Sequence, residues 1–449
     1  MATAAACLVV LPGLAQGDES GRTDAETPIR GSDEDRELAD AAAEPWELPV
    51  SSSDEPVRFV PQLQVRLRYR HHEGHEFAPG GVTDNFRHRV RLGLAATYAD
   101  RLGALVQLQD VRTFGEEQDP LGDYEADGFD LHQAYARLMP SESLEFRLGR
   151  QEIVIANSRL LGNVDFAEQA RAFDAFRVIH EADHTRLEAA YALVRDYPGG
   201  AGPGGSLLPD GKRHLGLFHL GHELMGELHP HVVAVAEGDT TTELTAITAG
   251  ALIDGRIGRG VRLDYTIEGY YQFGKEGAPT GSRAGAPMRY DAFLIATRAR
   301  ATAERSLEPY MEVITAFISG DDNPNDRTIK TFRSPYPTGH KFHGEMDLFL
   351  DFPRDTQLRG LVDLGAALGV GKAPITGRAS FHLFDGLARR GDTMRYFGYE
   401  LDFKAKWEFW EHASIDALYA LFVPGELVKA GRDDADVEHF AYSTMNVQF

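Results

Sequence analysis

The sequence predicts an all-β fold, an antiparallel transmembrane β-barrel of about 18 strands, and three observations lead to it. Apolar residues recur at every second position in segment after segment, with charged residues on the opposite face. The connections between these segments alternate between short and long. No run of about 18 apolar residues exists, so only a closed sheet is available to cross a membrane.

The alternation is clearest in three early segments. In Gln62–Arg70, four apolar side chains share one face and five polar or charged side chains share the other. Phe86–Tyr98 repeats this arrangement with three arginines on its polar face, and Leu144–Gln151 repeats it again. In a soluble sandwich the charged face would contact solvent. In a membrane barrel the apolar face contacts lipid and the charged face lines a water-filled lumen.

The same rhythm continues to the C-terminus. The predicted strands are 62–70, 86–98, 104–112, 131–139, 144–151, 173–179, 186–195, 213–222, 229–237, 243–252, 260–273, 289–300, 307–318, 342–352, 376–385, 394–409, 413–423 and 436–449. The last of them ends in Phe449, with Met445 and Val447 on one face and Phe440 and Tyr442 on the other. A terminal aromatic residue on an amphipathic last strand resembles the signal that the barrel assembly machinery recognises in bacterial outer-membrane proteins.

The lengths of the connections favour a membrane barrel over a sandwich. Short connections fall at 100–103, 140–143, 181–184 and 254–260, and long Gly-, Pro- and Asp-rich ones fall at 71–85, 113–129, 152–172, 196–212, 274–288 and 319–341. Short periplasmic turns on one rim and long extracellular loops on the other are typical of outer-membrane barrels. A soluble sandwich has no physical reason to sort its loops in this way.

One segment departs from this scheme. Arg354–Val370 stands where a short turn is due, and its leucines and alanines have the spacing of a short helix with an apolar stripe. Such a helix would fold under or into the mouth of the barrel. The alternative is one more strand and a different strand count.

The N-terminal residues are predicted to lie outside the barrel, which we expect to span residues 57–449. Residues 1–16 resemble a secretory signal, with an apolar centre and small residues before a cleavage point near Ala15, although the first basic residue is Arg22. An alanine-rich tail is the alternative, and the residues ahead of Cys7 make a poor lipidation motif. Residues 17–56 are acidic and poor in apolar residues, which predicts a disordered tail.

Composition excludes several classes of function. The net charge of −23 argues against nucleic acid as a partner, although only the local charge matters in a lumen. Cys7 is the single cysteine, so a disulfide framework is excluded. Asp321–Asp326 begins with the spacing of a calcium loop, but Asp326 and Phe332 stand where glycine and glutamate are required. We find no catalytic motif and predict neither enzyme activity nor a metal or cofactor.

Two long stretches carry a resemblance to a known family. Leu148–Val178 contains Gly-Arg-Gln-Glu, then Arg-Leu-Leu-Gly, then Arg-Ala-Phe-Asp; Ile318–Phe349 contains Ser-Gly-Asp, then Tyr-Pro-Thr-Gly-His, then Gly-Glu-Met-Asp. In these stretches the chain resembles the alginate-export family of outer-membrane proteins, whose order of elements covers about 57–449. The sequence departs from the family at Ile155 and Ala156, where an aromatic–Gly pair is usual, and near Asp165–Phe166, where a tryptophan is usual.

The resemblance implies an 18-stranded barrel that passes an anionic uronic-acid polysaccharide, and it suggests a monomer. Many relatives resemble the family only as porins of unassigned cargo. Both departures fall in a loop, so they bear on the identity of the cargo more than on the fold.

The candidate site is a set of arginines facing the lumen. Alternation places Arg70 and seven other arginines on inward faces, and three further arginines lie on or beside loop 152–172, which we expect to enter the lumen. The candidate pore-lining or substrate-binding residues are Arg66, Arg68, Arg87, Arg89, Arg91, Arg147, Arg150, Glu152, Arg159, Arg171, Asp174 and Arg177. Guanidinium pairs bidentately with carboxylate, so such a ladder would favour carboxylate-bearing cargo. The alternative is that these arginines pair with Glu145, Glu152, Asp110 and Asp174 and only hold the lumen together.

The leading hypothesis is therefore a passive channel in the outer membrane of a Gram-negative-type bacterium, with outer-membrane lipid around it. Its cargo would be an alginate-like anionic polysaccharide or small anionic solutes. The alternatives are a general diffusion porin of low selectivity, an outer-membrane enzyme acting on lipid or glycan, and a plugged structural barrel. The sequence does not choose between loops 319–341 and 354–370 as the segment that closes the pore.

Overall fold

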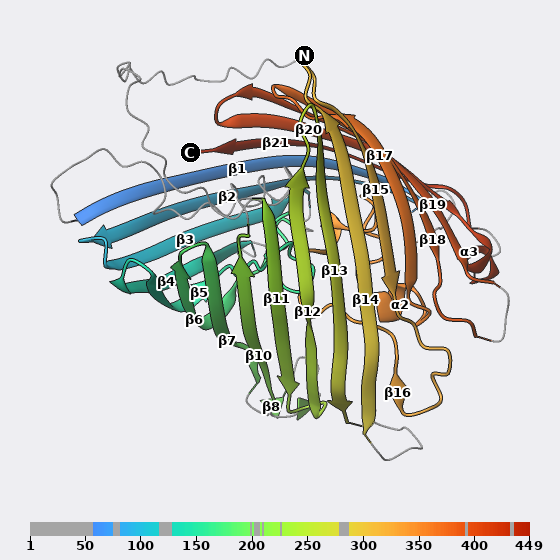
Figure 1. Ribbon diagram of the computed structural model, residues 1–449, viewed down its shortest axis with the longest axis horizontal. Coiled ribbons are helices and arrows are strands. Elements are labelled where there is room, and N and C mark those ends of the chain that lie inside the picture. The colour runs from blue at the N-terminus through green and yellow to red at the C-terminus, as the bar shows by residue number, and fades with distance from the viewer. Residues whose placement is uncertain are drawn as a thin grey trace. The chain divides into compact units, whose positions relative to one another are not determined.

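A closed antiparallel barrel dominates the computed structural model (Figure 1). The structure describes residues 57–74, 81–115, 128–197, 200–201, 207–208, 211–224, 227–277, 287–390, 394–431 and 435–449. All of them fall within the unit Gly31–Phe449. The signal-like segment 1–16 and the acidic segment 17–56 lie outside the described residues.

The main sheet of the described chain holds 19 strands, namely eighteen long strands and the short β16 (Thr328–Ile329). The long strands are β1 (Val57–Glu73), β2 (Val82–Tyr98), β3 (Leu102–Thr113), β4 (Phe129–Ser141), β5 (Leu144–Gln151), β6 (Phe173–Ala182), β7 (Thr185–Tyr197), β10 (Gly211–His222), β11 (Leu228–Asp239), β12 (Leu244–Ile257), β13 (Val261–Glu276), β14 (Met288–Ala303), β15 (Pro309–Ile318), β17 (Leu361–Val370), β18 (Ile375–Asp385), β19 (Tyr396–Trp410), β20 (Ala413–Pro424) and β21 (Glu438–Gln448). Each pairs with the next, and β21 pairs with β1 to close the barrel.

Short elements occur between these strands. They are β8 (Gly200–Ala201), β9 (Leu207–Leu208), the 3₁₀ helix η3 (Gly339–Lys341), α2 (Phe352–Asp355) and α3 (Glu426–Gly431). No helix among the described residues is long and apolar enough to cross a membrane.

The predicted strands match the observed ones with one exception. The strand expected at 342–352 is wrong, because this stretch belongs to a long connection, 319–360, between β15 and β17. The missing strand is β17, so most of the expected helix over Arg354–Val370 is also wrong; only the single-turn α2 is helical there. The small and apolar residues of this stretch fit the two-residue period of a strand as well as the helical period of about 3.6 residues. Hydrogen bonding to β15 and β18 makes it a strand in the folded protein.

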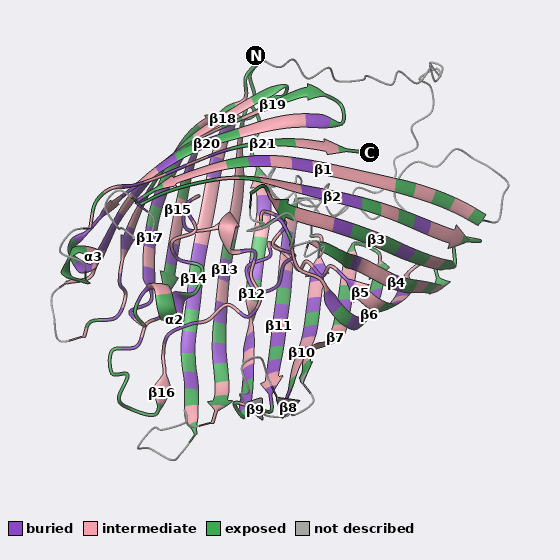
Figure 2. Cartoon of the chain, turned by 180° about the vertical axis from the view of Figure 1, so that it is seen from behind, coloured by how far each residue is buried: buried purple, intermediate pink, exposed green. Residues whose placement is uncertain are grey.

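The two faces of the wall are inverted relative to a water-soluble protein. Outward apolar side chains are exposed, among them Ile267 at 53% and Leu368 at 64%, whereas inward charged side chains such as Arg89 and Glu400 have no exposed surface. Figure 2 shows the alternation along β13 and β14. Backbone groups in lipid need partners within the protein, and a closed sheet supplies them.

The rim where the strands are joined by short turns carries exposed aromatic residues. Trp407, Trp410 and Phe449 are each about half exposed there, and the ring of Phe449 packs edge-on against that of Trp410 at 5.6 Å. Aromatic girdles of this kind sit at membrane interfaces. The faces of the last strand agree with the prediction: Phe440 and Tyr442 are buried inside, and Met445 is exposed outside.

Candidate functional site

Two long loops fold into the lumen and join there. We call loops 152–172 and 319–360 together the plug. Tyr336 donates its N–H to the carbonyl of Leu160 (2.9 Å) and accepts from the N–H of Gly162 (2.9 Å), and Thr338 donates to the carbonyl of Ser158 (3.0 Å). Gly162 contacts Thr338 so closely that a Cβ has no room there. The two stretches that carried the family resemblance are thus neighbours in space.

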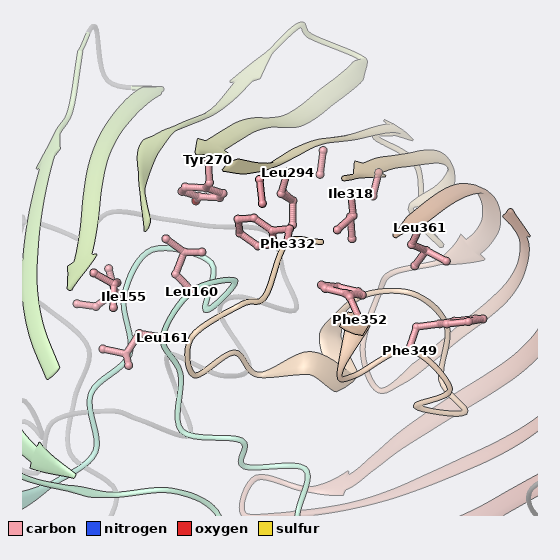
Figure 3. Close-up of a cluster of buried hydrophobic side chains, with 14 of the residues drawn as sticks. Ile155, Leu160, Leu161, Tyr270, Leu294, Ile318, Phe332, Phe349, Phe352 and Leu361 are labelled. Atoms are coloured by element: carbon pink, nitrogen blue, oxygen red, sulfur yellow. The ribbon is translucent and has the colours of Figure 1, made fainter. Parts of the chain in front are cut away.

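The plug has an apolar core against the wall. Leu160, Leu161 and Phe332 are buried in one cluster with wall residues that include Leu294 and Leu361 (Figure 3). Burying such side chains stabilises by about 1.5–3 kcal/mol each relative to exposure. The inward fold of both loops is therefore a packed structure rather than a loose flap.

Arginines of β1 and β2 hold one side of the plug. Arg66 donates from Nη2 to Oδ2 of Asp165 (2.8 Å) and from Nη1 to its main-chain carbonyl (2.6 Å). Nη2 of Arg89 lies 2.9 Å and Nη1 of Arg91 lies 3.4 Å from Oδ1 of the same carboxylate. Burial alone would raise the pKa of Asp165, but these three arginines hold that pKa well below its usual range.

The next residues of the loop continue this contact. Arg68 donates from Nη1 to Oε1 of Glu168 (2.6 Å) and to the carbonyl of Phe166 (2.7 Å), with its guanidinium 4.3 Å from the Phe166 ring. Arg89 donates to the main-chain carbonyls of Asp165 and Ala167. A residue with positive φ, Val164 at +55°, immediately precedes this segment and turns it onto the wall.

Two arginines beside these four are not held in this way. Arg87 stands directly opposite Arg68 in the sheet, and Arg70 follows two positions after Arg68 on the same face. Among the described residues, neither makes a hydrogen bond or an ion pair, and Nε of Arg87 is buried without a partner. Arg70 lies over the ring of Phe440, with 5.1 Å from Cζ to the ring centre. We call Arg66, Arg68, Arg70, Arg87, Arg89 and Arg91 together the arginine face.

The opposite side of the plug contacts carboxylates of the wall. Arg159 donates from Nη2 (2.7 Å) and Nε (2.9 Å) to Glu268 on β13, and it stacks on Phe342 at 3.6 Å. Its Nη1 lies 3.2 Å from Nε2 of His343, whose Nδ1 lies 3.0 Å from Asp363 on β17. Because guanidinium only donates, Nε2 accepts and His343 is neutral. Burial lowers the pKa of His343, in agreement with this state.

Backbone N–H groups of the plug bind a second wall carboxylate. Oε1 of Glu400 on β19 accepts from the N–H groups of Glu345 (2.6 Å) and Met346 (3.0 Å). Gly344, at φ +84°, aims these groups at the carboxylate, and a Cβ on it would overlap the carboxyl group. Successive N–H groups that converge in this way form an anion-binding nest.

His340 connects the two sides. Its ring stacks on Phe166 at 3.4 Å, and its Nδ1 lies 2.8 Å from Asp347 and its Nε2 lies 3.4 Å from Glu345. Burial alone would lower the pKa of His340, but these two carboxylates outweigh it and raise the pKa to about 8.

The remaining candidate residues occupy different places. Arg147 pairs with Glu145, as the pairing alternative expected, and Arg177 donates to Glu188 on the neighbouring strand (2.6 Å). Glu152 is the first residue of the plug. Its carboxylate accepts a hydrogen bond from the side chain of Asn163 (2.8 Å) and lies 3.6 Å from Nη1 of Arg91.

Three further candidates do not offer a free cation or carboxylate to the lumen. Arg171 donates only to carbonyls of the plug, those of Gly162 and Pro337, among the described residues. Arg150 and Asp174 are cross-strand neighbours on the face of Leu148, which is 65% exposed, so both point outward and not into the lumen. Asp110, an expected partner of the inward arginines, instead contacts His88 and Arg112.

Sequence reasoning missed the acidic half of the site. Asp165 entered only as a departure from the family pattern, and Glu168, Glu268, Asp363 and Glu400 were not singled out. Alternation places Glu268 and Glu400 on inward faces, so it was a signal that could have found these two, whereas Asp363 lies in the stretch that was expected to be helical. In Asp321–Asp326, where the sequence lacked the residues of a calcium loop, the side chain of Asp321 accepts a hydrogen bond from the N–H of Asn323 (2.9 Å), as in an Asx-turn. No metal-binding group of three or more ligands occurs among the described residues.

Comparison with known proteins gives one family and a set of solved structures. The family model described as alginate export matches residues 57–193 and 222–349. OccK8 (OprE) of Pseudomonas aeruginosa is similar in structure, with a TM-score of 0.58, 13% identity, and 87% of this chain and 98% of that chain covered. The outer membrane protein opdK of the same species has a TM-score of 0.57 and 11% identity, and OccAB4 of Acinetobacter baumannii has a TM-score of 0.59 and 8% identity. In both comparisons 87% of this chain and 98% of the other chain are covered. At these identities the likeness concerns the fold. No curated protein sequence matches.

Proposed function

Because the chain belongs to the alginate export family, we propose that it conducts anionic cargo, an alginate-like polyuronate or smaller carboxylates, along the arginine face. The coarser function is a passive channel in the outer membrane of a Gram-negative bacterium, as the family and the closed porin-like barrel indicate. The barrel supplies a path and a selectivity, and the gradient of the cargo supplies the direction. Family and fold both describe a channel rather than an enzyme.

The observation that carries the proposal is a pair of lumen arginines, Arg70 and Arg87, neither of which makes an ion pair among the described residues. Arginine is charged at every physiological pH, and rings of such cations favour anions in narrow pores. The overall negative charge of the chain does not oppose this, because a permeating ion responds to the charges nearest to it.

A second candidate, a plugged structural barrel, has its own support. The apolar core of the plug and its main-chain contacts between loops would suit a barrel that conducts nothing. The two candidates differ in measurable conductance.

The test is the reversal potential of the full-length protein in a planar bilayer under a KCl gradient, followed by addition of a hexauronate. The proposal expects an anion-selective current that the hexauronate blocks and that maltohexaose, a neutral chain of similar length, leaves unchanged. A cation-selective current, or one that the hexauronate does not block, would contradict it. No current at all would favour the structural barrel.

A further inference from the structure

We infer that residues 165–168 of the plug are an internal ligand: they occupy a carboxylate-binding site on β1 and β2 that a polyuronate takes over by displacing them. The inference rests on the proposed function, because it assigns the polyanion a binding site within the same lumen. It goes further by stating that the site is filled in the resting channel and by naming what fills it.

The contacts of Asp165 are those of a recognised carboxylate ligand. Three guanidinium groups converge on its two oxygens, from Arg66 and Arg89 at 2.8 and 2.9 Å and from Arg91 at 3.4 Å. One arginine is enough to neutralise a carboxylate, and charge-assisted bonds of this kind are strong and specific. Glu168 presents a second carboxylate to Arg68 at 2.6 Å. A polyuronate likewise presents one carboxylate on each sugar, at a regular spacing.

The wall carries more positive charge than the plug neutralises. The arginine face has six guanidinium groups, whereas the carboxylates that form ion pairs with it among the described residues are those of Asp165, Glu168 and Glu152. The register sets Arg66 directly opposite Arg89 and Arg68 directly opposite Arg87. Like charges in directly opposite positions destabilise a sheet. Two or three arginines would be enough to anchor the loop. The additional arginines fit a ligand that carries more carboxylates than the loop does.

The unpaired arginines lie where an incoming chain would meet them. β1 ends and β2 begins at the rim of the long loops, so Arg70 stands nearest that rim, the opposite pair Arg68 and Arg87 stands one step deeper, and the pair Arg66 and Arg89 stands deeper still. A polyuronate bound first to Arg70 and Arg87 has its next carboxylate beside Arg68. It can then replace Glu168 and Asp165 in turn, without leaving any of the buried arginines unpaired.

The segment is held in a way that permits exchange. Its contacts with β1 and β2 are polar, and Ala167 and Gln169 are exposed to the lumen. Of its side chains only Phe166 packs on the apolar cluster, whereas Leu160 and Leu161 are part of that cluster. The turns of this segment are held by hydrogen bonds within it: the N–H of Ala167 donates to the carbonyl of Val164, and the N–H of Ala170 donates to the carbonyl of Ala167. Residues 164–170 can therefore leave the wall while Leu160 and Leu161 stay packed, and the contact that they give up besides the polar ones is that of Phe166 with Tyr442 on β21.

The first experiment measures whether the wall beneath the segment becomes accessible. Gln109 is 2% exposed and lies between Arg91 and the carbonyl of Gln169. In a full-length Cys7→Ser background, Gln109→Cys is titrated with uncharged N-ethylmaleimide, and heat-dependent gel migration shows that the barrel is folded. We expect hexauronate to raise the rate of modification about tenfold, because it populates a displaced state that is otherwise rare, whereas maltohexaose leaves the rate unchanged.

The outcomes separate this inference from the proposed function. If hexauronate blocks the current but does not raise the rate of modification, the internal-ligand assignment is wrong and the anion channel stands. If hexauronate neither blocks the current nor changes the rate, both are wrong.

A second pair of variants tests the competition directly. Asp165→Asn combined with Glu168→Gln removes the internal carboxylates, so hexauronate should block at a concentration about tenfold lower, since it no longer has a competitor. Glu188→Gln, which removes a buried lumen carboxylate remote from the arginine face and paired with Arg177, serves as the control and should leave the blocking concentration unchanged. Weaker block in the double variant would overturn the inference.

Discussion

The two sides of the plug are held by opposite arrangements of charge. On the β1–β2 side the wall is basic and the loop is acidic: arginines of the wall bind Asp165 and Glu168. On the β13–β19 side the wall is acidic and the loop is basic or neutral, with Glu268 bound by Arg159 and Glu400 bound by main-chain N–H groups. The plug therefore bridges a cationic wall and an anionic wall of the same lumen.

The difference lies in what remains after pairing. On the acidic side each contact is buried and specific, and the neutral His343 between Arg159 and Asp363 adds no surplus charge. On the basic side cations are left over, at Arg70 and Arg87. An anion therefore has two cations to bind on the basic side that make no ion pair among the described residues. We therefore expect the β13–β19 contacts to act as the fixed anchor of the plug and the β1–β2 contacts to be exchangeable.

The largest effect should follow from breaking the fixed anchor. Glu268→Gln leaves the buried Arg159 guanidinium without its counter-charge, which costs about 3–5 kcal/mol for a buried pair. The plug should loosen, and the mean single-channel conductance in a planar bilayer should rise. Glu188→Gln breaks a comparably buried pair within the wall, with Arg177, and should leave the conductance unchanged. Equal conductance in the two variants would show that the β13 contact does not hold the plug.

A smaller effect should follow at the N–H nest around Glu400. Gly344→Ala adds a Cβ where the Glu400 carboxyl lies, in addition to the strain of an alanine at φ +84°. The strain alone costs about 1–3 kcal/mol. Gly115→Ala is the matched control, because Gly115 has φ +80° and open space around its Cβ position. The apparent Tm should fall more for Gly344→Ala, and an equal fall would mean that the nest contributes nothing.

The stacking of His340 on Phe166 predicts a pH effect on the exchangeable side. The pKa of His340 is raised to about 8 by Asp347 and Glu345, so its ion pairs stabilise fully below about pH 6.5 and are lost as the pH rises through about 8. The shift corresponds to about 2 kcal/mol. Hydrogen exchange of residues 164–170, corrected for the intrinsic rate, should be slow at pH 6 and faster at pH 9. His340→Gln should remove this dependence, and loosening on acidification would contradict it.

The smallest effect in energy should be on selectivity. Arg87→Gln removes one unpaired cation of the lumen, so the anion-to-cation permeability ratio should fall a few-fold, which corresponds to about 1 kcal/mol. Arg150→Gln removes an arginine that points outward and should leave the ratio unchanged. Reversal potentials of the two variants provide the measurement. A shift of equal size in both would mean that overall charge, and not the arginine face, sets the selectivity.

The barrel was accessible to sequence reasoning because its signals are local. Alternation along each strand fixes which side chains face lipid and which face the lumen. A shift of one residue in the pairing register would turn every charged side chain toward lipid, so the register is strongly specified. The failure at 342–352 and 361–370 has a local cause as well. Gly344 opens the Gly-Glu-Met-Asp motif of the family, and the residues around it happen to alternate, whereas Gly365 and Gly369 in β17 weaken the strand pattern.

The sequence by itself determined that a chain of alternating strands with arginines on one face would form a closed sheet in a membrane. Only the tertiary structure decided which of those arginines are already occupied. Arg66 and Asp165 are 99 residues apart, and Arg159 and His343 are 184 apart, so no periodicity links them. A buried charge selects its partner by distance in the folded lumen, and that distance is set by how two long loops pack, which depends on side-chain shape rather than on spacing in the sequence.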